Sequence, residues 1–533
     1  MDISIKSACG RPGEKLGLEM EMAVMDGQGR SHSVSRFFSS LQNIKSSRGL
    51  DTVLKKQAGH DIGVITPFIH SSVDNAFNNL ESAIGPVPGG QGGLLSLHQL
   101  AIQELEDVSD ALAEEGATLL NFSEHPNVAI DPQYYAAVRA PKAIYDYWVL
   151  VRGWNHSVGI DAKAQNGPTT AVEFEDAVSA LNVMLAVAPA FVALFANSPF
   201  EAGRLTGLKE NRLTIWPRMF ATSFYEGDRH LERLPERPFR DLRDYFDWMF
   251  GAGTVMQAVP MGGFEEYKTA ATSIQLVGDP SLLEFLRGGS RSGRCLLTGQ
   301  QVTLQPSVGH LEFLQFSHFL DARIRYGLQT IPSNEEFFAA WDEPYGLEKL
   351  FTKHSDNCYI EGRAAGANFP DTDLLNEPEN DVAESCVISA SAMQAGLLRN
   401  LSQAQKLVDR WGWQEIRGLR EAAIRSALDG ESAGLRVADF CRDVLDVAEE
   451  GLSADERWML SYPRYVSDSG MTGADRAIAL WESSSVRDLN HLARRRAVQL
   501  PQKSLSLPRY FGHLANPTPV QLTLGLNSPA MSS

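Results

Sequence analysis

Cysteine is scarce in this sequence, and its spacing argues against both a disulfide framework and a cysteine-based zinc site. The five cysteines are scattered and odd in number, and no CxxC pair occurs; they are Cys9, Cys295, Cys358, Cys386 and Cys441. Isolated thiols of this kind are typical of a reducing compartment. We therefore expect a cytoplasmic protein.

Positive charge is also in short supply. The chain has 48 Lys and Arg against 66 Asp and Glu, which gives a formal net charge of −18 over 533 residues. Nucleic-acid binding needs a basic footprint, so this balance argues against a nucleic-acid partner. It leaves room for a local basic pocket that binds phosphates, and most of the acidity is explained by solubility.

Long apolar runs and several familiar motifs are missing. The most apolar run, Val183 to Ala196, contains Pro189 and is shorter than the roughly 20 residues that a spanning helix needs. The opening MDISIKSACGRPGEK has no apolar signal core. We expect a buried helix and no membrane segment. No GxxxxGK[ST] loop, internal repeat, or spaced Ser-His-Asp or Cys-His set occurs.

The segment GLEMEM carries the sharpest chemical pattern in the sequence. Strand alternation places Leu18, Met20 and Met22 on one face, and Glu19 and Glu21 on the other, about 7 Å apart. Two acids facing one way repel each other unless a cation lies between them, and a divalent ion with oxygen ligands is the usual solution. The alternative is a solvated strand face.

Two further acids matter only if the fold brings them to this pair. Glu81 lies in NNLESAIGP, before a Gly/Pro-rich turn, and by itself is typical of a surface glutamate. Glu361 lies in CYIEGR, with Arg363 two residues later, a spacing that most often makes a local salt bridge.

The basic candidates lie further along the chain. In ANSPFEAGRLTGLKENRLTIW, residues 196–216, an apolar helix ends at Asn197 and a glycine-bearing loop leads to Arg212. That arrangement suits either an anion site or a surface salt bridge. Arg323 and Arg325 in DARIRYG would be presented together by a strand, and Lys268 lies in FEEYKTAA.

Two histidines, His125 in SEHP and His156 in NHSVG, lie beside predicted strands. Each alone is more often structural than a ligand or base.

Periodicity gives a coarse outline of the elements. It predicts strands at 15–25, 59–69, 117–122 and 155–161, and helices at 94–112, 170–195 (with a bend or break near Pro189), 239–250 and 334–350. A long loop is expected at 364–384, followed by helices at 390–411, 413–428 and 437–452, and a Pro- and Ser-rich tail.

In their order along the chain, these segments resemble the glutamate–cysteine ligase family in its plant and proteobacterial branch. GLEMEM resembles the first-strand G-x-E-x-E motif, NNLESAIGP the second acidic motif, SEHPN a G-T-H-P turn, NHSVGID the central strand, and YIEGR the late acidic motif. The 196–216 segment is the most specific match, close to A-N-S-P-[FW]-x-x-G-x-x-[NT]-G-x-x-S-x-R-x-x-[IV]-W. The similarity covers most of residues 15–330, a patch near 360, and 387–485.

The resemblance implies an α+β fold like that of glutamine synthetase, in which a curved antiparallel sheet forms a cleft and helices cover its outer face. It also implies an ATP- and Mg²⁺-dependent ligase that joins an amino-acid carboxylate, such as the γ-carboxylate of glutamate, to an amine such as cysteine through an acyl phosphate. Phosphoryl transfer of this kind needs mainly positioning and charge neutralisation.

Carried over by position, the resemblance makes Glu19, Glu21, Glu81 and Glu361 metal ligands. It makes Arg212, Arg323, Arg325 and Arg363 catalytic groups that face the same cleft. Substrate contacts would come from Asn197, Arg212, His125, His156 and Lys268. Small-molecule amino acids and amines are the expected partners, and the sequence does not indicate an oligomeric state.

The sequence departs from the family pattern in one important place. A helical stretch, 331–350, separates RIRYG from YIEGR, so either it is an insertion or one of the two matches is accidental. Ser157 and Glu210 also stand where the family often has other residues. We expect a catalytic unit at 1–386 with that insertion and the 364–384 loop, helices at 387–498 packing on the same domain, and an irregular tail at 499–533. Alternatives are a homologue that binds ligand without ligation, and a phosphotransferase on the same fold.

Overall fold

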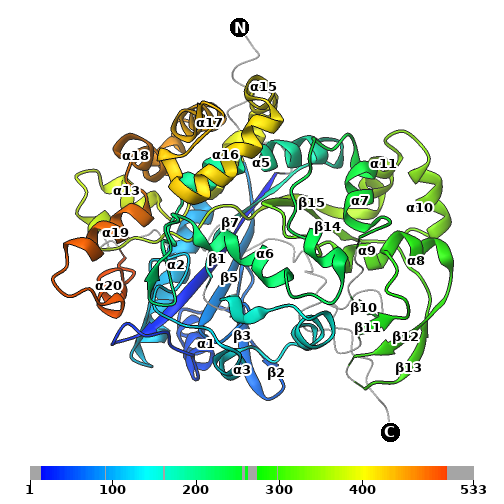
Figure 1. The fold of residues 1–533 in the computed structure, drawn as a ribbon, viewed down its shortest axis with the longest axis horizontal. Helices are drawn as coiled ribbons and strands as arrows, with labels where there is room; N and C mark the ends of the chain where they lie inside the picture. Colours follow the sequence, from blue (N-terminus) through cyan, green and yellow to red (C-terminus); the bar gives the residue numbers. More distant parts are fainter. Residues whose placement is uncertain are drawn as a thin grey trace.

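The computed structural model describes residues 14–90, 92–159, 163–254, 258–261, 273–296 and 298–500. Lys268, Cys9 and nearly all of the expected tail lie outside these ranges. The described chain combines many helices with antiparallel sheets (Figure 1), so the predicted α+β class is confirmed.

A nine-stranded antiparallel sheet forms the centre of the molecule (Figure 1). Its path runs β14-β15-β7-β1-β5-β4-β3-β2, and β6 pairs with the far end of β1. The strands are β14 (Ala322–Leu328), β15 (Ser355–Gly362), β7 (Asn166–Ala171), β1 (Lys15–Asp26), β5 (Asn79–Pro88), β4 (Ile69–Val73), β3 (His60–Ile65), β2 (Val53–Gln57) and β6 (Ala117–Leu119).

One face of this sheet is apolar and packs against helices. Leu18, Met20 and Met22 of β1 are each at most 2% exposed. The covering helices are α1 (Phe37–Ser47), α2 (Gly93–Ala113), α5 (Phe174–Leu194), α14 (Ser389–Arg399) and, near the β14 edge, α7 (Leu242–Phe250) and α11 (Gly346–His354). The alternation predicted for β1 is confirmed, because its apolar side chains lie in the main core and its acids do not.

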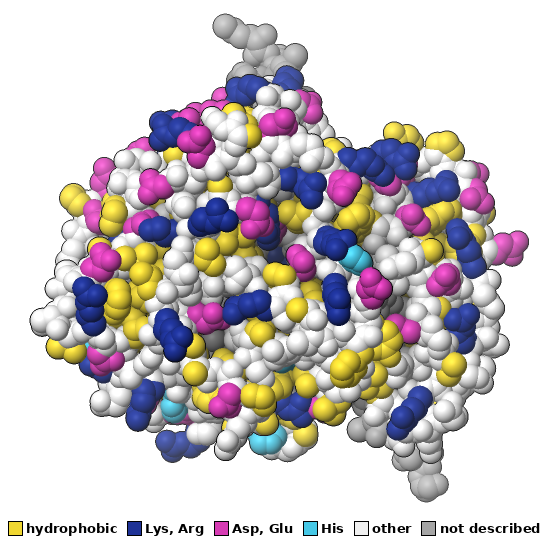
Figure 2. Space-filling view, in the orientation of Figure 1, with side chains coloured by type: hydrophobic (Ala, Val, Ile, Leu, Met, Phe, Trp, Pro, Cys, Tyr) yellow, Lys and Arg dark blue, Asp and Glu magenta, His cyan; other side chains and the backbone are white. Residues whose placement is uncertain are grey.

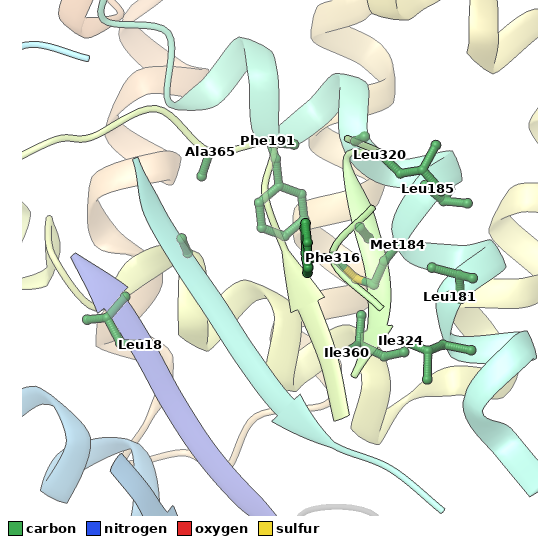
Figure 3. Packing of buried hydrophobic residues seen from close by; sticks show 14 of the residues in the cluster. Leu18, Leu181, Met184, Leu185, Phe191, Phe316, Leu320, Ile324, Ile360 and Ala365 are labelled. Atoms are coloured by element: carbon green, nitrogen blue, oxygen red, sulfur yellow. The ribbon is translucent and has the colours of Figure 1, made fainter. Parts of the chain in front are cut away.

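Helix α5 is the central helix of the core. It is apolar enough by length and composition to span a membrane, and 89% of its most apolar window is buried inside the protein. Figure 3 shows Leu181 and Met184 of α5 reaching toward Ile324 of β14 and Ile360 of β15. The expected buried helix is therefore present. It runs without a break through Pro189.

A second, four-stranded sheet lies beyond the β14 edge (Figure 1). It contains β10 (Val259–Pro260), β11 (Ser273–Leu276), β12 (Arg291–Cys295) and β13 (Gln301–Leu304). The helices on this side are α8 (Leu282–Gly288), α9 (Gly309–Leu314) and α10 (Asn334–Trp341). The 331–350 stretch thus forms α10 and the first turn of α11, in the connection between β14 and β15.

Of the six C-terminal helices of the described chain, the first four pack against the core helices, and the last two pack in a separate apolar cluster with Ala23 and Met25 of β1. The six are α15 (Leu401–Trp411), α16 (Trp413–Ser426), α17 (Val437–Glu450), α18 (Ser461–Ser469), α19 (Gly473–Ser483) and α20 (Leu489–Arg495). The remaining α-helices of the described residues are α3 (Pro132–Val138), α4 (Ala143–Asp146), α6 (Ile215–Phe220), α12 (Thr372–Leu375) and α13 (Asn380–Ser385). Short two-stranded pairs complete the fold: β8 (Phe200–Glu201) with β9 (Arg204–Leu205), and β16 (Glu431–Ser432) with β17 (Leu435–Arg436).

Four local predictions need correction. The segment NHSVGID was expected to be a strand, but His156–Val158 form a single 3-10 turn between glycines with positive φ, Gly153 and Gly159. The helix expected at 390–411 divides into α14 and α15 at Asn400. The loop expected at 364–384 contains α12 and most of α13, and residues 79–88 form one strand, not a turn. In each case tertiary pairing outweighs the local pattern.

Candidate functional site

Acidic side chains from neighbouring strands gather on the polar face of the large sheet. Glu21 of β1 is the register partner of Glu81 of β5, and Glu19 lies two residues before Glu21 on the same side of β1. Glu81 is 8% exposed, and Glu19 and Glu21 are partly buried. The fold therefore brings together three of the four predicted metal ligands.

The electrostatics of Glu21 show how crowded these acids are. Burial raises the pKa of Glu21 well above its usual range, and the negative charges of Asp74, Glu19 and Glu81 raise it further. Asp74, one residue beyond β4, was not identified from the sequence, because nothing in SVDNAF marks it as more than a turn residue.

The arginines of β14 face the late acidic motif on β15. Arg323 and Glu361 are register partners, and the Arg323 guanidinium donates to both carboxylate oxygens, at 3.0 Å from Nε and 2.8 Å from Nη2. Arg363 Nη1 donates to the same carboxylate at 2.8 Å, and Arg325 Nε lies 3.6 Å from it. YIEGR thus occupies the strand beside RIRYG, and the helices α10 and α11 lie in the connection between the two strands.

This arrangement gives Glu361 a different electrostatic environment from Glu21. Burial alone would raise the pKa of Glu361, but the guanidiniums of Arg323, Arg325 and Arg363 hold it well below its usual range. The two carboxylates are on the same sheet face, but three acids act on Glu21 together with Arg363, whereas three arginines act on Glu361. Glu361 is therefore ionised and fully engaged by arginines in this structure.

Arg212 is buried at the end of the 196–216 segment. It is 4% exposed, donates from Nε to Glu210 at 2.8 Å and from Nη2 to the carbonyl of Ala364 at 3.0 Å. Glu210, which departs from the family pattern, is thus the ionic partner of Arg212. The segment places Arg212 beside the chain that leaves β15, close to Arg363.

Lys163 is a further cation on this face that was not identified from the sequence. It precedes β7 by three residues, and continuing the β1–β7 register places it on the face that carries Glu19 and Glu21. Burial lowers the pKa of Lys163 to about 7. Because a strand was predicted at 155–161, the alternation of β7 was not extended back to residue 163. Lys268, the predicted lysine of the site, lies outside the described residues.

Asn197 has a structural environment. Its Nδ2 donates to Asn121 Oδ1 at 3.1 Å and to the carbonyl of Ala367 at 2.9 Å, and its Oδ1 accepts from Arg496 Nη2 at 3.2 Å. The side chain is fully buried. Both polar atoms of the amide are used to join the chain near α5 to the C-terminal helices.

The two candidate histidines are also buried in the fold. His156 accepts or donates a hydrogen bond with Tyr135 Oη at 2.8 Å and lies among Tyr145, Trp148 and Trp154. Burial lowers the pKa of His156 to about 3 and that of His125 to about 4, so both rings are neutral at pH 7. His125 Nδ1 accepts from the backbone of Asn127, within its own turn.

The acids of the polar face suit a hard divalent cation by their chemistry. Carboxylate oxygens are the ligands that Mg²⁺ prefers. Burial and the neighbouring acids raise the pKa of Glu21, and a bound cation would oppose that shift. Within the described ranges, no group of three or more His, Cys, Asp or Glu side chains is already arranged to hold a metal ion.

The fold and the polar face define an α+β protein that gathers carboxylates and cations on one side of an antiparallel sheet. Residues 15–249 match the model of glutamate–cysteine ligase family 2 (GCS2). The predicted resemblance to the glutamate–cysteine ligase family is therefore confirmed over that part of the chain. The match contains Glu19, Glu21, Glu81, Lys163 and Arg212, and it ends before β14 and β15.

The fold was also compared with solved structures, all at low identity. A glutamate–cysteine ligase from Francisella tularensis in complex with AMP aligns at 12% identity and a TM-score of 0.44, over 94% of this chain and 91% of that one. A bifunctional glutathione synthetase from Pasteurella multocida aligns at 13% and 0.42, over 91% and 51%. The ligase PafA, in complex with the prokaryotic ubiquitin-like protein Pup, aligns at 10% and 0.33, over 91% and 72%. At these scores the alignments carry no functional argument. No curated protein sequence matches this chain.

Proposed function

We propose that this protein is an ATP- and Mg²⁺-dependent carboxylate–amine ligase with a glutamine-synthetase-like catalytic sheet, and that its donor substrate is the γ-carboxylate of glutamate. The observation that carries the proposal is the polar face itself. Acids of β1 and β5 lie on the same side of one sheet as the arginines of β14 and β15. The family match over residues 15–249 supports it independently.

The reaction would proceed in two steps. The donor carboxylate attacks the γ-phosphorus of ATP, so that an acyl phosphate forms and ADP leaves. The amine then attacks the acyl carbon, an amide bond forms, phosphate leaves and the amine loses a proton. A bound Mg²⁺ would neutralise phosphate charge during this sequence.

The residues of this chain would act mainly by holding charge in place. Glu19, Glu21 and Glu81 would hold the metal, and Arg363 and Arg212 would bind anionic groups of ATP or donor. Arg323 and Arg325 hold Glu361 and, through it, the position of Arg363. Preorganised charges of this kind stabilise a transition state without rearrangement during the reaction.

The experiment is ADP release from purified protein with MgATP and glutamate, screened against amino acids and small amines. Release that depends on both glutamate and one amine would support the ligase and name the acceptor. Release that needs the carboxylate but no amine would support a phosphotransferase. ATP binding without release under any pair would contradict a ligase and favour a homologue that only binds ligand.

Glu21→Gln tests the metal assignment within the same assay. It removes one charge without changing size, and we expect turnover to fall by about a hundredfold or more. Asp26→Asn is the matched control, since Asp26 ends the same strand but bonds only its own turn, through Gln28 and Arg30. Unchanged turnover in Glu21→Gln would remove Glu21 from the metal site.

A further inference from the structure

Lys163 is held at two points beside the acidic face. Its carbonyl oxygen accepts a hydrogen bond from Asn79 Nδ2 at 2.6 Å, and Asn79 lies on β5 two residues before Glu81. Its ammonium nitrogen lies 3.4 Å from the centre of the Trp216 ring. The side chain is 5% exposed, so backbone and tip are both fixed.

Among the described residues, no carboxylate is in direct contact with the ammonium of Lys163. In the described part of the chain, no ion pair or side-chain hydrogen bond reaches its ammonium, whereas Lys45 is paired with Glu104 and Lys209 with Asp475. A buried charge is costly unless it is paired. The Trp216 ring face offsets part of this cost through a cation–π contact.

Other cations of the site lie within electrostatic reach of Lys163. Arg212 and Arg363 repel its ammonium, while Glu21 and Asp74 attract it. Trp216 and Arg212 belong to the same short segment, so one piece of chain supplies both the aromatic support and a neighbouring guanidinium. Lys163 thus lies within electrostatic reach of two guanidiniums as well as of the carboxylates of Glu21 and Asp74, and an anion that enters here meets three cations.

We infer that Lys163 is a substrate-binding residue which, together with Arg212 and Arg363, holds an oxyanion of the reactants; this inference rests on the proposed ligase function. The oxyanion is either a phosphate of ATP or a carboxylate of the donor amino acid. A compact ammonium suits this position because it acts as a point charge on a phosphate or carboxylate oxygen. Trp216 supports the cation when the anion is absent.

The test compares Lys163→Met, Lys163→Arg and the control Lys209→Met by equilibrium binding of MgATP, glutamate and inorganic phosphate. Lys209 is a half-buried lysine of the 196–216 segment, which also contains Arg212 and Trp216. Its ammonium is paired with Asp475, outside the polar face. We expect Lys163→Met to weaken one of the probes by about tenfold or more and Lys163→Arg to weaken it less. Lys209→Met should match the wild type. Thermal unfolding of each variant checks folding, and Lys163→Gln serves as a second neutral variant if Lys163→Met does not fold.

The pattern of losses identifies the anion. Weaker MgATP and phosphate binding with glutamate unchanged assigns Lys163 to the phosphate, and the reverse assigns it to the donor carboxylate. Wild-type affinity for all three probes in the folded neutral variant overturns the inference, as does a wild-type protein that binds none of them. Because binding requires no turnover, a protein that binds ligand without releasing ADP would contradict the ligase function and still decide the role of Lys163.

Discussion

Glu124 illustrates how a single buried side chain links folding to pH. It is 1% exposed, and burial followed by the charge of Glu201 raises its pKa to about 8, against 4.5 for the free group. The folded protein therefore holds a proton that the unfolded chain has lost between those two pH values. Because the folded state binds more protons there, this group's contribution to stability falls as pH rises through the window.

We predict that Glu124→Gln removes this contribution to the pH dependence. The amide can still accept the hydrogen bond that Asn211 Nδ2 donates at 2.9 Å. The unfolding free energy of the variant minus that of the wild type should rise by about 1.4 kcal/mol per pH unit in the middle of the window. This difference should become constant above pH 8. Urea denaturation between pH 5 and 9 measures it, with Glu335→Gln on the exposed surface of α10 as the control. A difference that stays flat with pH would show that Glu124 is ionised.

Glu21 supports a prediction about metal binding that does not depend on catalysis. Its pKa is raised by burial and by Asp74, Glu19 and Glu81, so a cation at this point relieves repulsion. Millimolar Mg²⁺ without nucleotide should raise the melting temperature of the wild type by about 2–4 °C. The increment should vanish in Glu21→Gln and persist in Asp26→Asn. An equal increment in all three proteins would place Mg²⁺ elsewhere.

At the scale of elements, the segment after α5 acts as a junction. Asn197 joins Asn121, Ala367 and Arg496, which come from three distant parts of the chain. We predict that Asn197→Ala destabilises the fold by about 3 kcal/mol, because buried partners are left unpaired. The KM values of the folded fraction should stay near those of the wild type. A raised KM together with an unchanged unfolding free energy would contradict this prediction and would indicate that Asn197 contacts substrate.

The sequence predicted those features of the fold and the site that depend on interactions between residues close together in the chain. Alternation in GLEMEM was sufficient to place Glu19 and Glu21 opposite Leu18, Met20 and Met22, because the apolar and acidic faces differ residue by residue. The turn at His156 was missed, because NHSVG contains strand-forming residues but is fixed by Tyr135 and three other rings from outside the segment.

Partners on other strands were beyond local reasoning. The sequence paired Glu361 with Arg363, but the bidentate contact from Arg323 depends on the β14–β15 register, and the helices α10 and α11 separate these two strands in the chain. Asp74 and Lys163 carried no motif, and only the completed sheet shows which charges face them. A helix was expected at 170–195, and α5 is present from 174 to 194, because a long apolar run is decided by its own composition. Residues 170 and 171 belong to β7.

At the scale of the whole molecule, buried ion pairs tie the C-terminal helices to the sheet domain. Arg496, just after α20, lies 2.7 Å from the carboxylate of Asp371, and both side chains are at most 1% exposed. Arg399 at the end of α14 binds Glu14 before β1 and Glu456 near α18. On the face drawn in Figure 2, acidic and basic side chains are interspersed.

We predict strong coupling between Asp371 and Arg496 in a double-mutant cycle. Asp371→Asn or Arg496→Met alone leaves an uncompensated buried charge, which costs about 3–5 kcal/mol. The double variant should be less destabilised than the sum of the two by at least about 1 kcal/mol. Denaturant unfolding supplies the three differences. The more exposed pair Arg410 and Asp443 is the comparison, with an expected coupling under about 1 kcal/mol. Additive losses at Asp371 and Arg496 would show that the pair does not act as a unit.

The acids of the polar face are carried by β1, which pairs with β5, β7 and β6 and has core side chains on its other side. Amide hydrogens of Glu19 and Glu21 should therefore exchange with solvent only when the whole sheet opens, since central strands are the last parts of a protein to open. A site carried by a central strand stays formed until the whole protein unfolds. Heating should extinguish its ligand binding in the same step that melts the protein, with no inactive but folded species before it.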